Sequence, residues 1–360
     1  MNNLDFFYNQ PSPYSLSKEH KREAIELHLS RLDTHHYQNC KSYQNMTNSF
    51  RHGNWLSSNS LLMPVRLFKQ QELKSVPQED VFKVLTSSGT TSQVVSRIIL
   101  DRGTASNQSK VLVKIMQHYL GLQRLPMLII DHPSVVKDRT SFSARGAGIL
   151  GLATFGRDHT YALDDDMTIN IERVKSFSEK YSGQPVFIFG FTFMIWQYFF
   201  QELKAKNIHL NLSDAVLVHS GGWKKLIDVA VDNTVFKQVA YNTCEIKRVH
   251  NFYGMVEQVG SIFVECSHGY LHAPDYADID IISAETMKVL PYGEKGLIAV
   301  SSVLPYSYPG HRLLTEDLGT IYGEDNCACG LKGKYFHVHG RVPKAEVRGC
   351  SDTHAVEQKL

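Results

Sequence analysis

From about residue 78 onward, short apolar runs alternate with longer segments of helical periodicity, and this alternation limits the folds that the chain can adopt. The apolar runs with the length of strands are 81–85, 127–130, 186–189 and 215–219. The segments with the periodicity and length of helices are 104–121, 141–155, 167–181 and 192–207. Strands that alternate with helices indicate a mostly parallel sheet with helices on both faces. The predicted fold class is therefore α/β.

Closely spaced strand candidates follow residue 248. They are separated by Gly, Pro and Asp rather than by helices, and they lie at 260–265, 279–283 and 296–300. This spacing predicts a smaller antiparallel β subdomain beside the main sheet.

The sequence before the main sheet differs in composition. Residues 1–75 are polar and predict an N-terminal helical segment, with an amphipathic helix at 17–32. We therefore expect three parts: this segment, a core at 76–340, and a C-terminal strip with a short tail at 341–360.

Charge and cysteine content exclude several classes of protein. The 360 residues carry 38 Lys and Arg against 36 Asp and Glu, a balance that argues against a nucleic-acid partner. The six cysteines are too few for a disulfide scaffold of this length, and the N-terminus lacks the pattern of a signal peptide. The longest apolar stretch, 186–200, is too short to span a membrane. We expect a cytoplasmic protein without a membrane span.

A run of hydroxyl residues surrounds one glycine at 86–93, which reads T-S-S-G-T-T-S-Q. Hydroxyl groups and bare backbone N–H groups form a binding site for anions. The run follows the strand predicted at 81–85, which we expect to be buried, and open α/β sheets bind ligands at the carboxyl ends of such strands. The loop contains no lysine and is therefore not the common P-loop. It predicts a site for a nucleotide polyphosphate.

The segment at 251–258 reads N-F-Y-G-M-V-E-Q. The ring of Tyr253 could stack on a purine, and Gly254 would let the backbone approach a ligand. The carboxylate of Glu257 could hold a Mg²⁺ ion that bridges phosphates. By itself, a Tyr-Gly pair is also common in structural turns.

Two more segments have the chemistry of a nucleotide site. An acidic residue within 312–319, at the end of a strand, could accept hydrogen bonds from both ribose hydroxyls, although an exposed turn carboxylate would look the same. The segment at 340–349 is basic and bounded by glycines.

In this order, the four segments resemble the hydroxyl-rich phosphate loop, Tyr-Gly-x-x-Glu segment, ribose-binding Asp and Gly-Arg hinge of the adenylate-forming ligase superfamily. Residues 251–352 further resemble the acyl-protein synthetases of bacterial bioluminescence, the ligase subunits of a fatty acid reductase complex. The resemblance covers about residues 80 to 352. It implies the large domain of an adenylate-forming ligase.

The resemblance implies a site for ATP and Mg²⁺. Glu257 would bind Mg²⁺, Asp317 the ribose, and Arg341 would stabilise charge that develops during adenylation. The adenine would be flanked by Tyr253, Gly254, Gly221 and Gly222. The phosphates would be held by Ser87, Ser88, Gly89, Thr90 and Thr91, and Thr90 is also expected to act in catalysis.

Two features differ from the superfamily pattern. The loop usually continues Gly-x-Pro-Lys, whereas residues 92–95 read S-Q-V-V, so another cation must assist the leaving pyrophosphate. Arg97 and Lys224 are the candidates. Most relatives also carry a mobile C-terminal domain with a catalytic lysine, and this sequence ends shortly after Gly349. We therefore expect that domain to be lacking.

Cys350 lies just beyond the hinge-like strip, with Lys344 and Arg348 nearby. Neighbouring cations lower the pKa of a thiol and favour the nucleophilic thiolate. In the synthetases that the chain resembles, a cysteine near the C-terminus accepts the acyl group, and Cys350 matches it. The implied activity is ATP-dependent conversion of a long-chain fatty acid to acyl-AMP, followed by transfer to Cys350 as a thioester. The implied partners are an acyl reductase, which makes aldehyde, and an acyltransferase.

Two other functions stay open on sequence grounds. The chain could be an acyl- or aryl-CoA or carrier-protein ligase of envelope or secondary-metabolite biosynthesis, or an inactive scaffold relative. Phe191 and Phe193 follow a predicted strand and could line an acyl channel, although core packing is the default explanation of this apolar run.

The remaining cysteines suggest a metal. Three thiols and one imidazole suit a structural Cys₃His zinc site, and the candidate ligands are Cys266, His272, Cys327 and Cys329. Because C-x-C is less specific than C-x-x-C, reduced cysteines of the core are the alternative.

Overall fold

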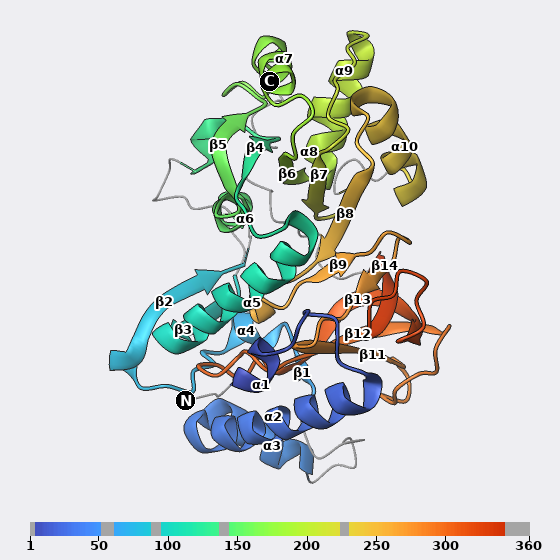
Figure 1. Cartoon of the computed structure of the whole chain (residues 1–360). Coiled ribbons are helices and arrows are strands. Elements are labelled where there is room, and N and C mark those ends of the chain that lie inside the picture. Colours follow the sequence, from blue (N-terminus) through green and yellow to red (C-terminus); the bar gives the residue numbers. More distant parts are fainter. Residues whose placement is uncertain (1–3, 52–60, 88–94, 137–143, 224–229, 343–360) are drawn as a thin grey trace. The chain divides into compact units, whose positions relative to one another are not determined.

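A computed structural model describes residues 4–51, 61–87, 95–136, 144–223 and 230–342 (Figure 1). The chain divides into two compact units. The first contains Met1–His118 and Gly254–Glu346, and the second contains Tyr119–Tyr253.

A parallel sheet forms the centre of the second unit. In spatial order its strands are β5 (Gly156–Tyr161), β4 (Leu125–Ile129), β6 (Phe187–Phe191), β7 (Val216–Ser220) and β8 (Arg248–Tyr253). All neighbouring pairs are parallel. The middle strand β6 reads FIFGF and is buried along its whole length, as expected for a strand covered on both faces. The predicted α/β fold class is confirmed.

Helices follow the strands of this sheet. They are α6 (Ala144–Ala153), α7 (Ile171–Lys180), α8 (Thr192–Ile195), α9 (Gln201–Ala205) and α10 (Asn233–Cys244), with a π-helix at Trp196–Phe200 joining α8 to α9. Asn170 caps α7 by accepting the N–H of Arg173 at 3.0 Å. Asp232 caps α10 by accepting the N–H of Val235 at 2.8 Å. The starts of these two helices are therefore specified by local side chains.

The first unit contains an antiparallel sheet. In spatial order its strands are β11 (Ala277–Ile282), β12 (Lys295–Ser302), β13 (Arg312–Glu324), β14 (Lys334–Arg341), β10 (Leu271–His272) and β9 (Phe263–Glu265). The short β1 (Met63–Pro64) pairs with β13 in parallel. The antiparallel region predicted after residue 248 is confirmed.

The helices that begin in the first unit are α1 (Asp5–Tyr8), α2 (Lys18–Asn39), α3 (Lys41–Arg51), α4 (Leu67–Gln70) and α5 (Arg102–Leu120). Figure 1 shows α2 and α3 side by side. The predicted helix is present and extends to Asn39, and its buried residues recur at helical spacing from Lys21 to His36. The prediction that it is amphipathic is not supported, because Lys21, His28 and His36 lie on the buried face beside the apolar residues.

The strand predicted at 81–85 exists, but its predicted environment is wrong. It is β2 (Val81–Thr86), which pairs with β3 (Arg97–Asp101) in a separate two-stranded antiparallel sheet. Phe82 and Val84 are 47% and 41% exposed, and the guanidinium of Arg102 lies 4.5 Å from the centre of the Phe82 ring. The hydroxyl-rich run therefore does not begin at the carboxyl end of a buried parallel strand.

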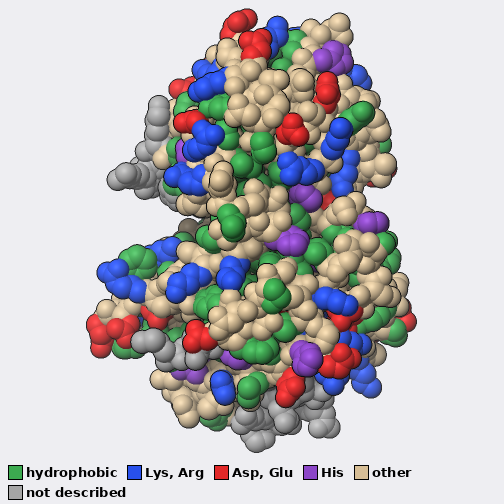
Figure 2. Space-filling view, in the orientation of Figure 1, with side chains coloured by type: hydrophobic (Ala, Val, Ile, Leu, Met, Phe, Trp, Pro, Cys, Tyr) green, Lys and Arg blue, Asp and Glu red, His purple; other side chains and the backbone are tan. Residues whose placement is uncertain are grey.

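On the face shown in Figure 2, acidic and basic side chains are interspersed. This agrees with a net charge of +2. Among the helices of the described ranges, none is both long enough and apolar enough to cross a membrane.

Candidate active site and metal centre

Ser87 and Ser96 hold the two ends of the hydroxyl-rich run together. The backbone N–H of Ser87 donates to the carbonyl of Ser96 at 3.1 Å, and the N–H of Ser96 donates to the hydroxyl of Ser87 at 2.9 Å. The predicted phosphate ligands Ser88, Gly89, Thr90 and Thr91 lie outside the described residues. Of the predicted phosphate-binding set, the structure thus places Ser87, at the neck of the run.

Glu257 lies in a one-turn 3₁₀ helix, Val256–Gln258, and is 9% exposed. The hydroxyl of Tyr308 donates to its carbonyl at 2.9 Å, and the amide of Gln258 donates to the carbonyl of Gly310 at 2.8 Å. A Cβ on Gly310 would lie 2.9 Å from the Glu257 carbonyl oxygen, so this close approach requires glycine. The backbone that carries the carboxyl is therefore fixed from two sides.

Asp317, the predicted ribose ligand, and Arg341, the predicted positive charge, lie on neighbouring strands of the sheet. Asp317 on β13 pairs in register with Arg341 on β14, and Arg341 Nε lies 3.5 Å from Asp317 Oδ1.

The charges of Asp317 and Arg341 both affect the pKa of Glu257. Burial raises the pKa of the Glu257 carboxyl, and the hydroxyl of Ser96 and the charge of Arg341 oppose that rise. The structure thus brings Glu257, Asp317, Arg341 and the neck of the hydroxyl-rich run into one neighbourhood of the first unit.

The glycine pair predicted beside the adenine lies in the second unit. Gly221 and Gly222 follow β7, and Gly221 has a φ of +83°, which favours glycine. Tyr253 is the last residue of β8, in the same unit, whereas Gly254 belongs to the first unit. Ser220 donates its hydroxyl to the carbonyl of Phe252 at 3.0 Å and so joins the ends of β7 and β8.

Of the two cations suggested for the leaving pyrophosphate, the structure places one. Arg97 is exposed on β3 and stands opposite Thr86 in the hairpin. Lys224 lies outside the described residues, as do Lys344, Arg348 and Cys350.

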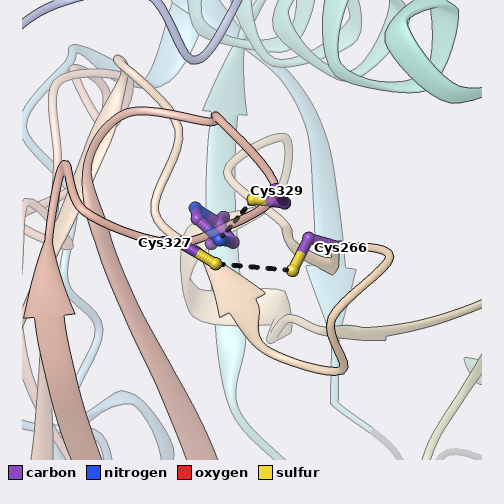
Figure 3. A group of neighbouring side chains, drawn as sticks. Cys266, Cys327 and Cys329 are labelled. Atoms are coloured by element: carbon purple, nitrogen blue, oxygen red, sulfur yellow. Dashed lines mark hydrogen bonds between the residues drawn. The ribbon is translucent and has the colours of Figure 1, made fainter.

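The four predicted metal ligands converge in the first unit. Cys266 follows β9, His272 ends β10, and Cys327 and Cys329 lie in the turn between β13 and β14. Their ligand atoms all lie within 4.8 Å of one another, and Figure 3 shows the three cysteine side chains pointing toward a common point.

The distances between these ligand atoms fit a tetrahedral zinc site. Cys266 Sγ lies 4.0 Å from Cys327 Sγ, and Cys329 Sγ lies 3.4 Å from His272 Nε2. Tetrahedral zinc, with Zn–S bonds of about 2.3 Å, separates two sulfurs by about 3.8 Å and a sulfur from a nitrogen by about 3.6 Å. Three thiols and an imidazole with this spacing can hold the metal.

The surroundings of the ligands also suit thiolates bound to a metal. The backbone N–H of His268 donates to Cys266 Sγ, and that of Leu331 donates to Cys329 Sγ, each at 3.4 Å. Burial lowers the pKa of His272 to about 4, so its imidazole is neutral, as a metal ligand must be. Burial also raises the pKa of the Cys329 thiol to about 12. Without a cation this thiol keeps its proton.

A buried ion pair in the second unit was not identified from the sequence. Arg145 on α6 is 2% exposed, and its Nε lies 3.2 Å from Asp131 Oδ2, just beyond the end of β4. Its Nη2 lies 3.0 Å from His132 Nε2. Burial raises the pKa of Asp131 to about 6, and Arg145 opposes that rise. The feature of the sequence that could have indicated it is the pair Asp131-His132, directly after an apolar strand.

Comparison with solved structures defines the class of fold. An open conformation of 2-hydroxyisobutyryl-CoA ligase, in complex with 2-HIB-AMP and CoA, aligns with a TM-score of 0.67 at 16% identity, over 92% of this chain and 77% of that one. The same ligase in its thioesterification state aligns with a TM-score of 0.68 over 96% and 73%. The fold is therefore that of the adenylate-forming ligases.

Sequence comparison gives the family. The chain belongs to the acyl-protein synthetase (LuxE) family, which it matches over residues 2–360. The long-chain-fatty-acid–luciferin-component ligase of Aliivibrio fischeri is 23% identical over 338 residues, which cover 88% of this chain and 83% of that protein. The protein of the same name from Vibrio harveyi is 25% identical over 141 residues.

Proposed function

We propose that this chain uses ATP to convert a long-chain fatty acid into acyl-AMP and pyrophosphate, and then transfers the acyl group to a thiol. One structural observation carries the proposal: Glu257, Asp317 and Arg341 gather at the neck of the hydroxyl-rich run. Membership of the acyl-protein synthetase family and the name of the Aliivibrio fischeri relative support the choice of a fatty acid.

The first step activates the carboxylate, which is a poor electrophile. A carboxylate oxygen attacks the α-phosphorus of ATP, and the bond to pyrophosphate breaks. We assign Asp317 to the ribose hydroxyls and Arg341 to the charge that develops on the phosphate. Mg²⁺ bound at Glu257 would neutralise phosphate charge.

The second step moves the acyl group onto sulfur. A thiolate attacks the acyl carbon, and AMP leaves with the bonding electrons. We assign the thiol to Cys350, because Lys344 and Arg348 stand close to it in the sequence and cations favour the thiolate. The thioester would then pass to an acyl reductase, which works with an acyltransferase in the same complex.

We also propose a structural zinc ion at the four-residue cluster described above. It would join the turn between β13 and β14 to the β9–β10 hairpin, since each of these two elements supplies two of the four ligands. Asp317 and Arg341 lie on β13 and β14, and Glu257 precedes β9 in the sequence. The metal would thus stabilise the strands and turns that carry the proposed nucleotide ligands.

The purified protein is expected to contain about one zinc ion per chain. Cys329→Ser should lose the metal and lower the Tm by about 10 °C or more, because binding energy at a structural zinc site is folding energy. Metal content by mass spectrometry and thermal unfolding check both effects. Cys40→Ser is the matched control, since Cys40 is buried in the same unit but outside the cluster. The proposal would be contradicted if the purified wild-type protein contained no zinc and treatment with a chelator left its Tm unchanged.

Phe191 is proposed to form part of the wall of the acyl site. It ends β6, and its ring packs against two glycines: a Cβ on Gly148 would lie 3.2 Å from the Phe191 ring, and a Cβ on Gly221 3.3 Å from it. The ring therefore fills space at the carboxyl end of the parallel sheet, where ligands bind.

Phe191→Ala is expected to shift the preference of the enzyme toward longer fatty acids severalfold, because each buried methylene is worth about 0.8 kcal/mol. The ratio of kcat/KM for acids of increasing length checks this in pyrophosphate exchange. If kcat/KM fell by the same factor for fatty acids of every length, the Phe191 ring would only pack in the core and would not line the acyl site.

A further inference from the structure

The guanidinium of Arg145 is buried at the carboxyl edge of the parallel sheet, where it contacts side chains from two other elements. Its Nε lies 3.2 Å from Asp131 Oδ2 and its Nη2 lies 3.0 Å from His132 Nε2, both just beyond the end of β4. Its Nη1 lies 3.9 Å from Met194 Sδ on α8, the helix that follows β6. Because β4 and β6 are neighbours, Arg145 joins the start of α6 to the ends of two adjacent strands.

Asp131 is held in place as well, and its pairing with Arg145 is costly. Its Oδ1 accepts the backbone N–H of His132 at 2.8 Å, and the residue is 1% exposed. Among the described residues, Asp131 Oδ2 and Arg145 Nε complete no well-directed hydrogen bond, so their attraction repays little of the cost of burying two charges. Apolar side chains of similar volume could join the same elements at no greater cost. The pair therefore calls for a use other than stability.

One turn along α6 from Arg145, Gly148 lies against the proposed acyl site. Residues three apart share one face of a helix, so the face of α6 that carries Arg145 also carries Gly148. A Cβ on Gly148 would lie 3.2 Å from the Phe191 ring, which is tighter than ordinary van der Waals contact. A small shift of α6 would therefore move the ring or open a gap beside it.

We infer that Arg145 is a positioning residue of the acyl site: its buried contacts hold α6 so that Gly148 abuts the Phe191 ring. The inference rests on the proposed function, because Phe191 forms the wall of a site only if the chain binds a fatty acid. It follows that the affinity for the fatty acid, and the chain length that is preferred, depend on a charged pair that the acid need not touch.

The test replaces the pair by apolar side chains of similar total volume, in the double variant Asp131→Val/Arg145→Met. We expect this variant to fold with a Tm close to that of the wild type, because no buried charge is left unpaired. In pyrophosphate exchange, its KM for tetradecanoic acid should rise about tenfold or more, since small displacements of a substrate are costly. Its KM for ATP should stay close to the wild-type value, and the differences in kcat/KM among acids of increasing length should shrink.

Two further variants accompany it. Arg145→Lys keeps a cation opposite Asp131 but lacks the planar fork that reaches His132 and Met194 together, so its KM for the acid should rise by a smaller factor. The matched control is Asp164→Val/Arg173→Met, which removes another Asp–Arg pair of the same unit, half-exposed and with its nitrogen and oxygen 2.8 Å apart. This control should keep both KM values.

The wild-type KM for tetradecanoic acid and the wild-type chain-length preference in the folded double variant would overturn the inference. An equal rise in the KM values for acid and ATP would also overturn it, because the whole unit would then have loosened. If the double variant does not fold, Arg145→Lys decides by the same two criteria. Absence of exchange by the wild-type protein with every fatty acid would instead overturn the proposed function, so the two failures are distinguishable.

Discussion

Glu257→Gln is expected to lower fatty-acid-dependent exchange of pyrophosphate into ATP by about a hundredfold or more. Glutamine has nearly the shape of glutamate but no charge, and the buried position leaves little water to compensate for the charge that is lost. The effect should appear in kcat and in the Mg²⁺ dependence, with little change in the Tm. Exchange of radiolabelled pyrophosphate, measured over a range of Mg²⁺ concentrations, checks it.

Glu324→Gln is the matched control for this substitution. Glu324 ends β13 in the same unit, where it lies 3.3 Å from Lys18, and it has no assigned part in the reaction. It should exchange pyrophosphate at close to the wild-type rate. Near-normal exchange by folded Glu257→Gln would show that the carboxylate is not the ligand of the cation.

Cys350→Ala is expected to abolish acylation of the protein and to leave pyrophosphate exchange intact. The substitution removes the proposed thiol acceptor but none of the groups assigned to adenylation. Incubation with ATP, Mg²⁺ and tritiated tetradecanoic acid, followed by a denaturing gel, measures the acylated protein. Neutral hydroxylamine should remove the label from the wild type, as it does from a thioester.

Cys244→Ala is the control for this second substitution. Cys244 is fully buried at the end of α10, and burial raises the pKa of its thiol to about 12, so it is a poor nucleophile. This variant should keep the hydroxylamine-labile label. A label that persists in Cys350→Ala would place the acyl group on another residue.

The three strands β4, β6 and β7 of the parallel sheet could be predicted from the sequence because they are almost wholly buried, whereas the more exposed β5 and β8 were not predicted. Runs such as FIFGF in β6 are apolar at every position, and this pattern does not depend on knowing the neighbouring strands. The apolar run of β2 has similar length but different surroundings. Its pairing with β3 alone leaves Phe82 exposed, and Lys83 within the run is the local feature that distinguishes it from a strand buried on both faces.

The metal cluster was predictable because its residue types are rare and specific. Cys327 and Cys329 lie in one turn, and the hairpin of β9 and β10 brings Cys266 and His272 to them.

The buried pair of Arg145 and Asp131 was not identified from the sequence. Each residue type is common on protein surfaces, and their burial together depends on where α6 packs. Sequence patterns therefore suggested candidate ligands that form motifs, and the structure added a buried charged pair that no motif marks.

The most direct test of the proposed activity is pyrophosphate exchange by the purified wild-type protein with ATP, Mg²⁺ and tetradecanoic acid. The account predicts exchange that depends on the fatty acid and is lost in Asp317→Ala as well as in Glu257→Gln. Exchange without fatty acid, or none with any fatty or aromatic acid despite a folded protein, would contradict it.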